Sequence, residues 1–367
     1  MIKTAYYQDL TKMNTFGMKV KARCFMEYDS VADLVDIEFE ELARPVLHIG
    51  GGSNLLFTDD FKGTILHSKI DFIEVLDECH TDGTSSEDSS GLRHCEERSD
   101  VAISTPVLVS VGAGVIFDDF CDWAAKEGLW GVENLSYIPG EVGASAVQNI
   151  GAYGVEVKDV IHKVYCYDTV EEEFVSFGVE ECEYGYRDSV FKDPEIKGRY
   201  IVTHVVFALS RTPQPKLEYG HLKDAVVSGS LTPMQIRKAI IKIRKEKLPE
   251  PSVMGSAGSF FKNPVISAEH FAKIEAAAKA ELGADYKVPH YDLPDGTVKV
   301  PAAWMIEQCG WKGKRSGGAA VYDKQPLVIV NYTGEAYPEE IVGLEKRIIA
   351  SVKTKFAIEL HPEVEHI

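Results

Sequence analysis

Apolar residues in the first half of the chain fall into short runs bounded by turn residues. Residues 45–49 and 107–111 are two such runs, and glycine follows each of them directly. Residues 164–167 and 201–209 have the same apolar character. Short apolar runs that stop at glycine are typical of β-strands. The pattern therefore predicts at least four strands before residue 211.

A different period, of three to four residues, marks helices between and after these strands. Phe117, Phe120, Cys121 and Ala124 lie at positions i, i+3, i+4 and i+7. Gly128 follows where a helix commonly ends in a left-handed residue. The spacing predicts an amphipathic helix from residue 117 with its apolar face buried.

Further helix starts are marked by capping residues. Ser30 precedes an aspartate by three positions, which is close to a capping box. Thr232, Pro233 and Gln235 combine a cap, a first-turn proline and a third-position amide. A last helix is expected after Pro338, where apolar residues recur with helical spacing.

Two segments interrupt this order. Residues 211–216 contain two prolines and are interpreted as a linker. Residues 77–106 lack periodicity and are rich in Ser, Asp and Glu, which predicts an exposed insertion. The mixture of strands and helices indicates an α+β or α/β domain up to residue 211, followed by a second domain over 212–367.

Composition and charge limit the function further. The chain has 367 residues, enough for two or three domains. Lys plus Arg is 39 and Asp plus Glu is 57, a net charge of −18, so nucleic acid is not expected as a partner. No apolar run is long enough to span a membrane, and the start of the sequence has no secretory pattern. The seven scattered cysteines, without a CxxC pair, predict reduced thiols in a cytoplasmic protein and no metal site.

Two glycine-rich stretches are the strongest candidates for ligand binding. Residues 50–55 read Gly-Gly-Gly-Ser-Asn-Leu after a strand, and such a turn can present free N–H groups to a phosphate. Leu55 stands where a dinucleotide fingerprint would need glycine, and a simple tight turn explains the motif equally well. Residues 138–154 alternate glycines with small residues and two amides, which favours a backbone lying against a flat polar ligand over a tightly packed helix.

Other polar residues are ambiguous when taken alone. Arg187, between Tyr and Asp, suits either a surface ion pair or bidentate binding of a carboxylate. Ser259 lies outside any nucleophile elbow, so a serine hydrolase is disfavoured while a proton-donating hydroxyl is allowed. The cations near residues 237–247 suit either the helix dipole or a phosphate ligand. Glu363 near the end could simply be solvated.

Taken together and in this order, the motifs resemble one family, the UDP-N-acetylenolpyruvoylglucosamine reductases, known as MurB. The matching stretches are residues 14–17 (NTFG), 50–55 (GGGSNL), 138–154 (IPG…QNIGAYG), 186–189 (YRDS), 258–264 (GSFFKNP) and 362–364 (PEV). The resemblance covers nearly the whole chain apart from residues 77–106.

The resemblance implies an α+β fold and a two-step redox reaction. Residues 1–211 would form an FAD-binding portion of two α+β subdomains of the vanillyl-alcohol-oxidase type, and residues 212–367 a C-terminal α+β substrate-binding domain. NADPH would reduce a non-covalently bound FAD. The reduced flavin would pass hydride to UDP-N-acetylglucosamine enolpyruvate, giving UDP-N-acetylmuramate for peptidoglycan and hence cell-wall synthesis.

The resemblance also assigns roles to residues. Arg187 would polarise the substrate carboxylate, Glu363 would assist through a hydrogen bond that favours a raised pKa, and Ser259 would give the proton, directly or through a relay. The residues implied to contact FAD are Gly50, Gly51, Gly52, Ser53, Asn54, Leu55, Pro139, Gly140, Gly143, Ala144, Gln148, Asn149, Gly151, Ala152, Tyr153 and Gly154. Those implied to contact the UDP-sugar are Tyr219, Arg244, Lys247, Lys262, Asn263 and Gln308, with Tyr219 on the capping loop of one family subtype.

Two other functions remain open from the residues. One is an oxidase of the same flavin fold, in which His48 before the glycine turn could tether the flavin. The other is a non-catalytic nucleotide-sugar-binding regulator, although the presence of Arg187, Ser259 and Glu363 speaks against it. We expect the protein to be a monomer.

Overall fold

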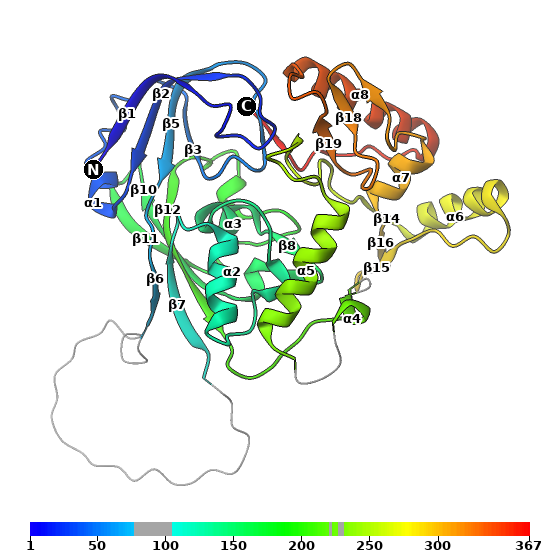
Figure 1. Ribbon diagram of the computed structural model, residues 1–367, viewed down its shortest axis with the longest axis horizontal. Helices are drawn as coiled ribbons and strands as arrows, with labels where there is room; N and C mark the ends of the chain where they lie inside the picture. The colour runs from blue at the N-terminus through cyan, green and yellow to red at the C-terminus, as the bar shows by residue number, and fades with distance from the viewer. Residues whose placement is uncertain (77–104, 220–221, 227–230) are drawn as a thin grey trace, which may run out of the picture. The chain divides into compact units, whose positions relative to one another are not determined.

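The computed structural model describes residues 1–76, 105–219, 222–226 and 231–367 (Figure 1). Its contacts divide the chain into two compact units. Unit 1 consists of Met1, residues 28–37 and residues 68–241, and unit 2 of residues 2–27, 38–67 and 242–367. The N-terminal strands thus belong to the same unit as the C-terminal residues. The functional division at residue 211 remains a prediction.

Unit 1 is built on a five-stranded antiparallel sheet in the order β11-β10-β12-β7-β6. Its strands are β6 (Ile73–Val75), β7 (Val107–Gly112), β10 (Ile161–Asp168), β11 (Glu173–Gly178) and β12 (Tyr200–Leu209). Strands β6 and β7 pair directly, with Ile73 opposite Val111. The predicted insertion at 77–106 connects these two neighbours and lies, except for its last two residues, outside the described chain.

Helices cover this sheet because their apolar faces complete its core. Helix α2 places Phe120 against Phe207 of β12, with ring centroids 4.6 Å apart, and Phe117 beside them is also buried. The helical segments of unit 1 are α1 (Val31–Val35), α2 (Phe117–Lys126), η2 (Glu133–Leu135), α3 (Val142–Gln148), η3 (Val157–Asp159), η4 (Val190–Lys192) and α4 (Leu222–Ala225), and a small hairpin, β8 (Gly151–Ala152) with β9 (Val155–Glu156), follows α3. Helix α5 (Pro233–Lys247) starts in unit 1, and its residues from Lys242 onward belong to unit 2.

Unit 2 combines three small sheets with three helices around a main hydrophobic core. The first sheet has the order β1-β2-β5-β3, the second β13-β19-β18-β17 and the third β14-β16-β15. Their strands are β1 (Lys3–Asp9), β2 (Lys21–Tyr28), β3 (Val46–Ile49), β5 (Phe61–Ser68), β13 (Gly255–Ser256), β14 (Val265–Ser267), β15 (Tyr291–Asp292), β16 (Thr297–Lys299), β17 (Arg315–Ser316), β18 (Ala319–Val321) and β19 (Ile329–Asn331). A parallel pair joins β4 (Leu55–Leu56) to β20 (Glu365–His366), and the helices are α6 (Ala268–Leu282), α7 (Ala302–Gln308) and α8 (Pro338–Phe356).

The N-terminal and C-terminal segments of unit 2 are joined by buried backbone contacts. The Asn331 side chain donates to the carbonyl of Phe16 at 3.0 Å, and the amide of Ser256 donates to that of Thr15 at 2.9 Å. A Cβ on Gly255 would lie 2.2 Å from the Phe16 oxygen, so only glycine allows this approach. The sequence-distant parts of the unit are therefore held at fixed separation.

The elements expected from periodicity are confirmed. The four predicted apolar runs lie in β3, β7, β10 and β12, and the helix from residue 117 ends before Gly128, whose φ is +70°. Thr232 and Gln235 cap each other reciprocally at the start of α5. Within the described ranges, no helix has both the length and the apolar character needed to cross a membrane.

Candidate functional site

The turn at residues 50–54 is shaped by close backbone packing in unit 2. Gly52 has φ +60°, and a Cβ there would lie 2.0 Å from the carbonyl oxygen of Met13. The carbonyl of Gly52 accepts a hydrogen bond from the amide of Thr15 at 3.1 Å. No backbone hydrogen bond among the described residues has the amide of Gly51 or Gly52 as donor. A fixed glycine turn whose Gly51 and Gly52 amides donate no backbone hydrogen bond within the described chain fits the pyrophosphate of a dinucleotide cofactor.

The C-terminal tail is bound directly to this turn. The side-chain amide of Asn54 donates to the carbonyl of Glu363 at 3.1 Å, and the amide of Glu365 donates to the carbonyl of Asn54 at 2.9 Å. The predicted acid Glu363 is therefore positioned by a residue of the predicted cofactor turn. Asn54 and Glu363 lie 309 residues apart in the sequence.

The same tail runs beside the segment that carries Ser259. The amide of Glu363 donates to the carbonyl of Phe260 at 2.8 Å, and the amide of Lys262 donates to the carbonyl of His361 at 2.9 Å. Phe261 and Pro362 form an antiparallel bridge between these bonds. Ser259 and Glu363 thus lie on neighbouring strands of backbone, and both are half-buried.

His366 holds the end of the tail in place. Its ring nitrogen lies 2.8 Å from a carboxylate oxygen of Glu345 on α8, a residue that is only 7% exposed. Its ring also meets Phe260 edge-on, with centroids 6.1 Å apart. The hydrogen bond with Glu345 raises the pKa of His366. Neither His366 nor Glu345 is singled out by the sequence, because nothing local marks them as partners.

In unit 1, the glycine-rich segment 138–154 forms a short helix and a hairpin. Gly143 lets α3 approach the sheet, because a Cβ there would lie 2.9 Å from that of Ala113. Asn149 ends the helix in the left-handed region at φ 44°. Tyr153 and Gly154 both have positive φ at the tip of the β8–β9 hairpin, as a two-residue type I′ turn requires.

Arg187 reaches this hairpin from a tight loop. Gly185 and Asp188 bridge each other, and Arg187 between them has φ +56°. Its guanidinium donates to the carbonyl of Gly151 at 2.5 Å and to that of Asn149 at 3.4 Å. A Cβ at position 151 would lie 2.8 Å from Nη1 of Arg187, so the glycine makes room for the guanidinium.

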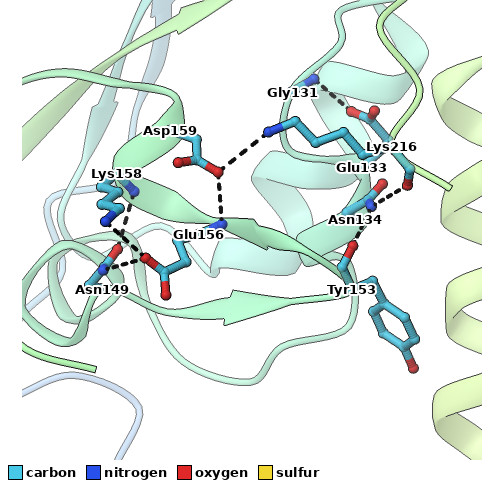
Figure 2. Close-up of polar contacts among 9 residues, drawn as sticks. All are labelled: Gly131, Glu133, Asn134, Asn149, Tyr153, Glu156, Lys158, Asp159 and Lys216. Atoms are coloured by element: carbon cyan, nitrogen blue, oxygen red, sulfur yellow. Dashed lines mark hydrogen bonds and ion pairs between the residues drawn. The ribbon is translucent and has the colours of Figure 1, made fainter. Parts of the chain in front are cut away.

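Asn149 acts as the centre of a buried hydrogen-bond network. Its side-chain amide donates to the Glu156 carboxylate at 3.1 Å, and its oxygen accepts from the amide of Lys158 at 3.3 Å (Figure 2). The same amide also donates to the Gly185 carbonyl at 2.8 Å. The side chain of Asn149 thus forms its hydrogen bonds with other residues of the protein. It holds both the loop of Arg187 and the hairpin that receives the guanidinium.

Lys192 secures the Arg187 loop from the other side. Its ammonium donates to the Arg187 carbonyl at 3.2 Å and to the side-chain oxygen of Gln148 at 3.1 Å. No local sequence pattern marks Lys192 as a site residue. Its partners lie 5 and 44 residues away, and only the fold brings the two together.

A second group of contacts fixes the tip of the hairpin. Asn134 is 1% exposed, and its amide donates to the carbonyls of Tyr153 at 2.9 Å and Lys216 at 2.8 Å (Figure 2). The ammonium of Lys216 lies 3.4 Å from the carboxylate of Asp159. Beside Asn134, burial raises the pKa of Glu133, whose carboxylate accepts from the amide of Gly131.

Tyr219 lies against the same tip. Its ring meets that of Tyr153 edge-on, with centroids 6.1 Å apart and an interplanar angle of 85°. The side chain of Tyr219 is 44% exposed. The two residues that follow Tyr219 lie outside the described chain.

The other predicted substrate residues have separate surroundings. Asn263 accepts from the amide of Ala302 at 2.9 Å, at the start of α7. Gln308 ends α7 and lines a pocket with residues of α6 and α8. Arg244 and Lys247 lie in the last turn of α5. Arg237 of the same helix binds Asp118 and Asp122 of α2, so this cation is structural.

The described structure places the predicted residues in both units. Unit 1 holds the 138–154 segment, Arg187 and Tyr219, while unit 2 holds residues 50–55, Ser259 and Glu363. In each unit, a residue that is predicted to bind the cofactor is in contact with a residue that is predicted to act on the substrate. His48 lies in β3 before the turn, where burial lowers its pKa to about 3 and keeps the imidazole neutral.

Two family models match parts of the chain. Residues 250–367 match the model described as UDP-N-acetylenolpyruvoylglucosamine reductase, C-terminal domain. Residues 99–175 match a model described as an FAD binding domain. The second match includes the whole of segment 138–154.

Known proteins match over almost the full length. The UDP-N-acetylenolpyruvoylglucosamine reductase of Bacteroides fragilis is 47% identical over 98% of both chains. That of Porphyromonas gingivalis is 42% identical over 98% of this chain and 97% of its own. The crystal structure of the enzyme from Thermus caldophilus is 22% identical, covers 100% of this chain and 98% of its own, and superposes with a TM-score of 0.61, which supports a shared fold.

Proposed function

Because the chain belongs to the UDP-N-acetylenolpyruvoylglucosamine reductase family, we propose that it reduces UDP-N-acetylglucosamine enolpyruvate during peptidoglycan synthesis. It is an FAD-dependent oxidoreductase with NADPH as co-substrate. When bound, FAD takes hydride from NADPH and supplies it to the enolpyruvyl group, which becomes the lactyl ether of UDP-N-acetylmuramate. The main support for this activity is the 47% sequence identity with the Bacteroides fragilis reductase over 98% of the chain.

Arg187 is proposed to hold the substrate carboxylate. Hydride arriving at the methylene carbon leaves negative charge on the α-carbon and the carboxylate. A cation that is already fixed in place stabilises such charge without reorganising during the reaction. The support is that two carbonyls, of Gly151 and Asn149, fix the Arg187 guanidinium.

Ser259 is proposed to give the α-carbon its proton, and Glu363 to assist by hydrogen bonding. The bond between the Glu363 amide and the Phe260 carbonyl supports a shared site, because it fixes the two backbones side by side. Asn54 ties the same backbone to the turn at 50–54, which we propose contacts FAD together with segment 138–154. Tyr219, Arg244, Lys247, Lys262, Asn263 and Gln308 are proposed contacts of the UDP-sugar.

Separating the half-reactions tests these roles. Ser259→Ala should leave the rate of flavin reduction by NADPH unchanged and slow the reoxidation of reduced flavin by the UDP-sugar at least about a hundredfold. Ser351→Ala, in α8 of the same unit, is the matched control and should leave both rates unchanged. Equal loss of both half-reactions in Ser259→Ala would refute the proton-donor role.

The location and assembly of the protein are proposed from its chemistry. Its substrates, a nucleotide sugar and NADPH, are cytoplasmic metabolites, so we place the enzyme in the cytoplasm. We propose a monomer. Sedimentation equilibrium of the holoenzyme would give the mass of one 40.6 kDa chain if this is right, and a multiple of it otherwise.

A further inference from the structure

Asn134 joins two segments that lie far apart in the sequence. Its side chain is buried within η2, and both hydrogens of its amide donate to main-chain carbonyls, one of Tyr153 and one of Lys216 (Figure 2). Because both partners are acceptors, only the orientation with nitrogen toward them is possible. Asn134 therefore fixes the distance between the hairpin tip and the chain just before Tyr219.

Tyr219 is in contact with both residues of the hairpin tip, Tyr153 and Gly154. The ring of Tyr219 contacts the ring of Tyr153 edge-on. A Cβ on Gly154 would lie 3.6 Å from the Cβ of Tyr219, which is ordinary contact distance. Tyr219 thus lies against the two residues of the hairpin tip, and Asn134 binds the carbonyl of one of them.

Besides the hydrogen bond from Asn134, the linker at residues 211–216 has a weaker contact through the side chain of Lys216. The ion pair between Lys216 and Asp159 has a separation of 3.4 Å, and both side chains are at least one-third exposed. Ion pairs in such surroundings contribute little, because water and salt screen them. Asn134 is buried, so its hydrogen bond to the Lys216 carbonyl restrains the linker more firmly than the ion pair does.

The side-chain oxygen of Asn134 makes this residue costly to bury. Its side-chain oxygen is buried and has no hydrogen-bond partner among the described residues. A buried acceptor without a partner is unfavourable, whereas the two hydrogen bonds of the nitrogen are favourable, and a leucine would deprive both carbonyls of their donor. An amide at this position is explained by the two segments that its nitrogen joins.

From these contacts we infer that Asn134 is a positioning residue that sets Tyr219 against the hairpin tip for binding of the UDP-sugar. The inference rests on the proposed contact between Tyr219 and that substrate. Asn134 itself touches neither substrate nor cofactor in this account. It acts through the linker that leads to Tyr219.

A double-mutant cycle on the holoenzyme tests this. Asn134→Leu should raise KM for the UDP-sugar about tenfold, the effect expected for two lost hydrogen bonds, and leave flavin reduction by NADPH unchanged. In a Tyr219→Ala background, Asn134→Leu should add nothing to KM, because the residue through which it acts is gone. Lys216→Met removes the ion pair and keeps the carbonyl, so it should change KM by less than about twofold.

The outcomes separate this inference from the proposal that it rests on. If Tyr219→Ala leaves KM unchanged, the proposed substrate contact is wrong. If Tyr219→Ala raises KM but Asn134→Leu does not, or if the two effects multiply in the double variant, the inference about Asn134 alone is overturned. Should Asn134→Leu yield no folded flavoprotein, Asn134→Ser retains one donor and should give an intermediate KM that also disappears in the Tyr219→Ala background.

Discussion

Replacing Gly151 with alanine should disable Arg187 without unfolding the protein. The added Cβ would lie 2.8 Å from Nη1 of Arg187, 3.0 Å from the carbonyl oxygen of Val155 and 3.1 Å from Cγ of Glu156. The Val155 carbonyl belongs to the hairpin backbone and cannot easily move. The guanidinium stands at the end of a flexible side chain, so it is the group that should be displaced.

The magnitude follows from this geometry. Normal van der Waals contact between such atoms is about 3.5–4.0 Å, so the guanidinium has to retreat by roughly 1 Å. It would then lose its 2.5 Å hydrogen bond to the Gly151 carbonyl. A catalytic group misplaced by about 1 Å can cost on the order of a hundredfold in rate. We expect reoxidation of the reduced enzyme by the UDP-sugar to slow by about 10–100-fold, or roughly 1.4–2.7 kcal/mol in the barrier.

Anaerobic stopped-flow measurement of the two half-reactions provides the assay. Flavin content and the rate of reduction by NADPH should equal those of the wild type. Gly343→Ala in α8 is the matched control, because a Cβ there meets nothing within 4 Å, and alanine should stabilise that helix by about 0.5–1 kcal/mol. If the UDP-sugar reoxidises the reduced Gly151→Ala variant at the wild-type rate, a fixed guanidinium at this place does not stabilise the developing charge.

The tail, the glycine turn and the insertion give further predictions. Because Glu345 raises the pKa of His366, the bond stabilises the folded protein below the unfolded pKa of histidine and is lost as pH rises through the folded value. His366→Gln should therefore lower Tm more at about pH 6 than at about pH 9, and an equal loss at both would contradict the ion pair. Gly52→Ala puts a Cβ 2.0 Å from the Met13 oxygen at φ +60°, so flavin content after purification should fall sharply; a fully loaded variant would show that the turn is not needed. Replacing residues 77–104 with a short turn should leave flavin content and turnover unchanged, because β6 and β7 on either side pair directly, and loss of flavin would assign the insertion a role in cofactor binding.

The sequence allows prediction of those elements whose burial is visible in their own residues. Strands β7 and β12 are apolar runs, and α8 has a regular apolar stripe, so periodicity locates them. Strand β1 is exposed or half-buried throughout, and β13 has two residues, so neither presents a periodic pattern. Such strands are fixed by their partners, which for β13 lie more than 70 residues further along the chain.

The same limit applies to the candidate site. Glycine-rich motifs are recognisable because their conformations need glycine, and the family resemblance assigns roles to Arg187, Ser259 and Glu363. No local pattern marks Asn134 or Lys192, since a buried amide or a half-buried lysine is identified only by its partners. The pairing of the tail with the Asn54 turn also depends on a contact across 309 residues, which no local pattern encodes.

One anaerobic spectrum tests the central claim most directly. The purified protein is titrated with NADPH and then with UDP-N-acetylglucosamine enolpyruvate while its visible flavin absorbance is followed. Membership of the reductase family predicts that NADPH bleaches the flavin and that the UDP-sugar alone restores the colour, with one UDP-N-acetylmuramate formed per flavin reoxidised. A flavin that is bleached by NADPH but recovers only when oxygen is admitted would contradict the account.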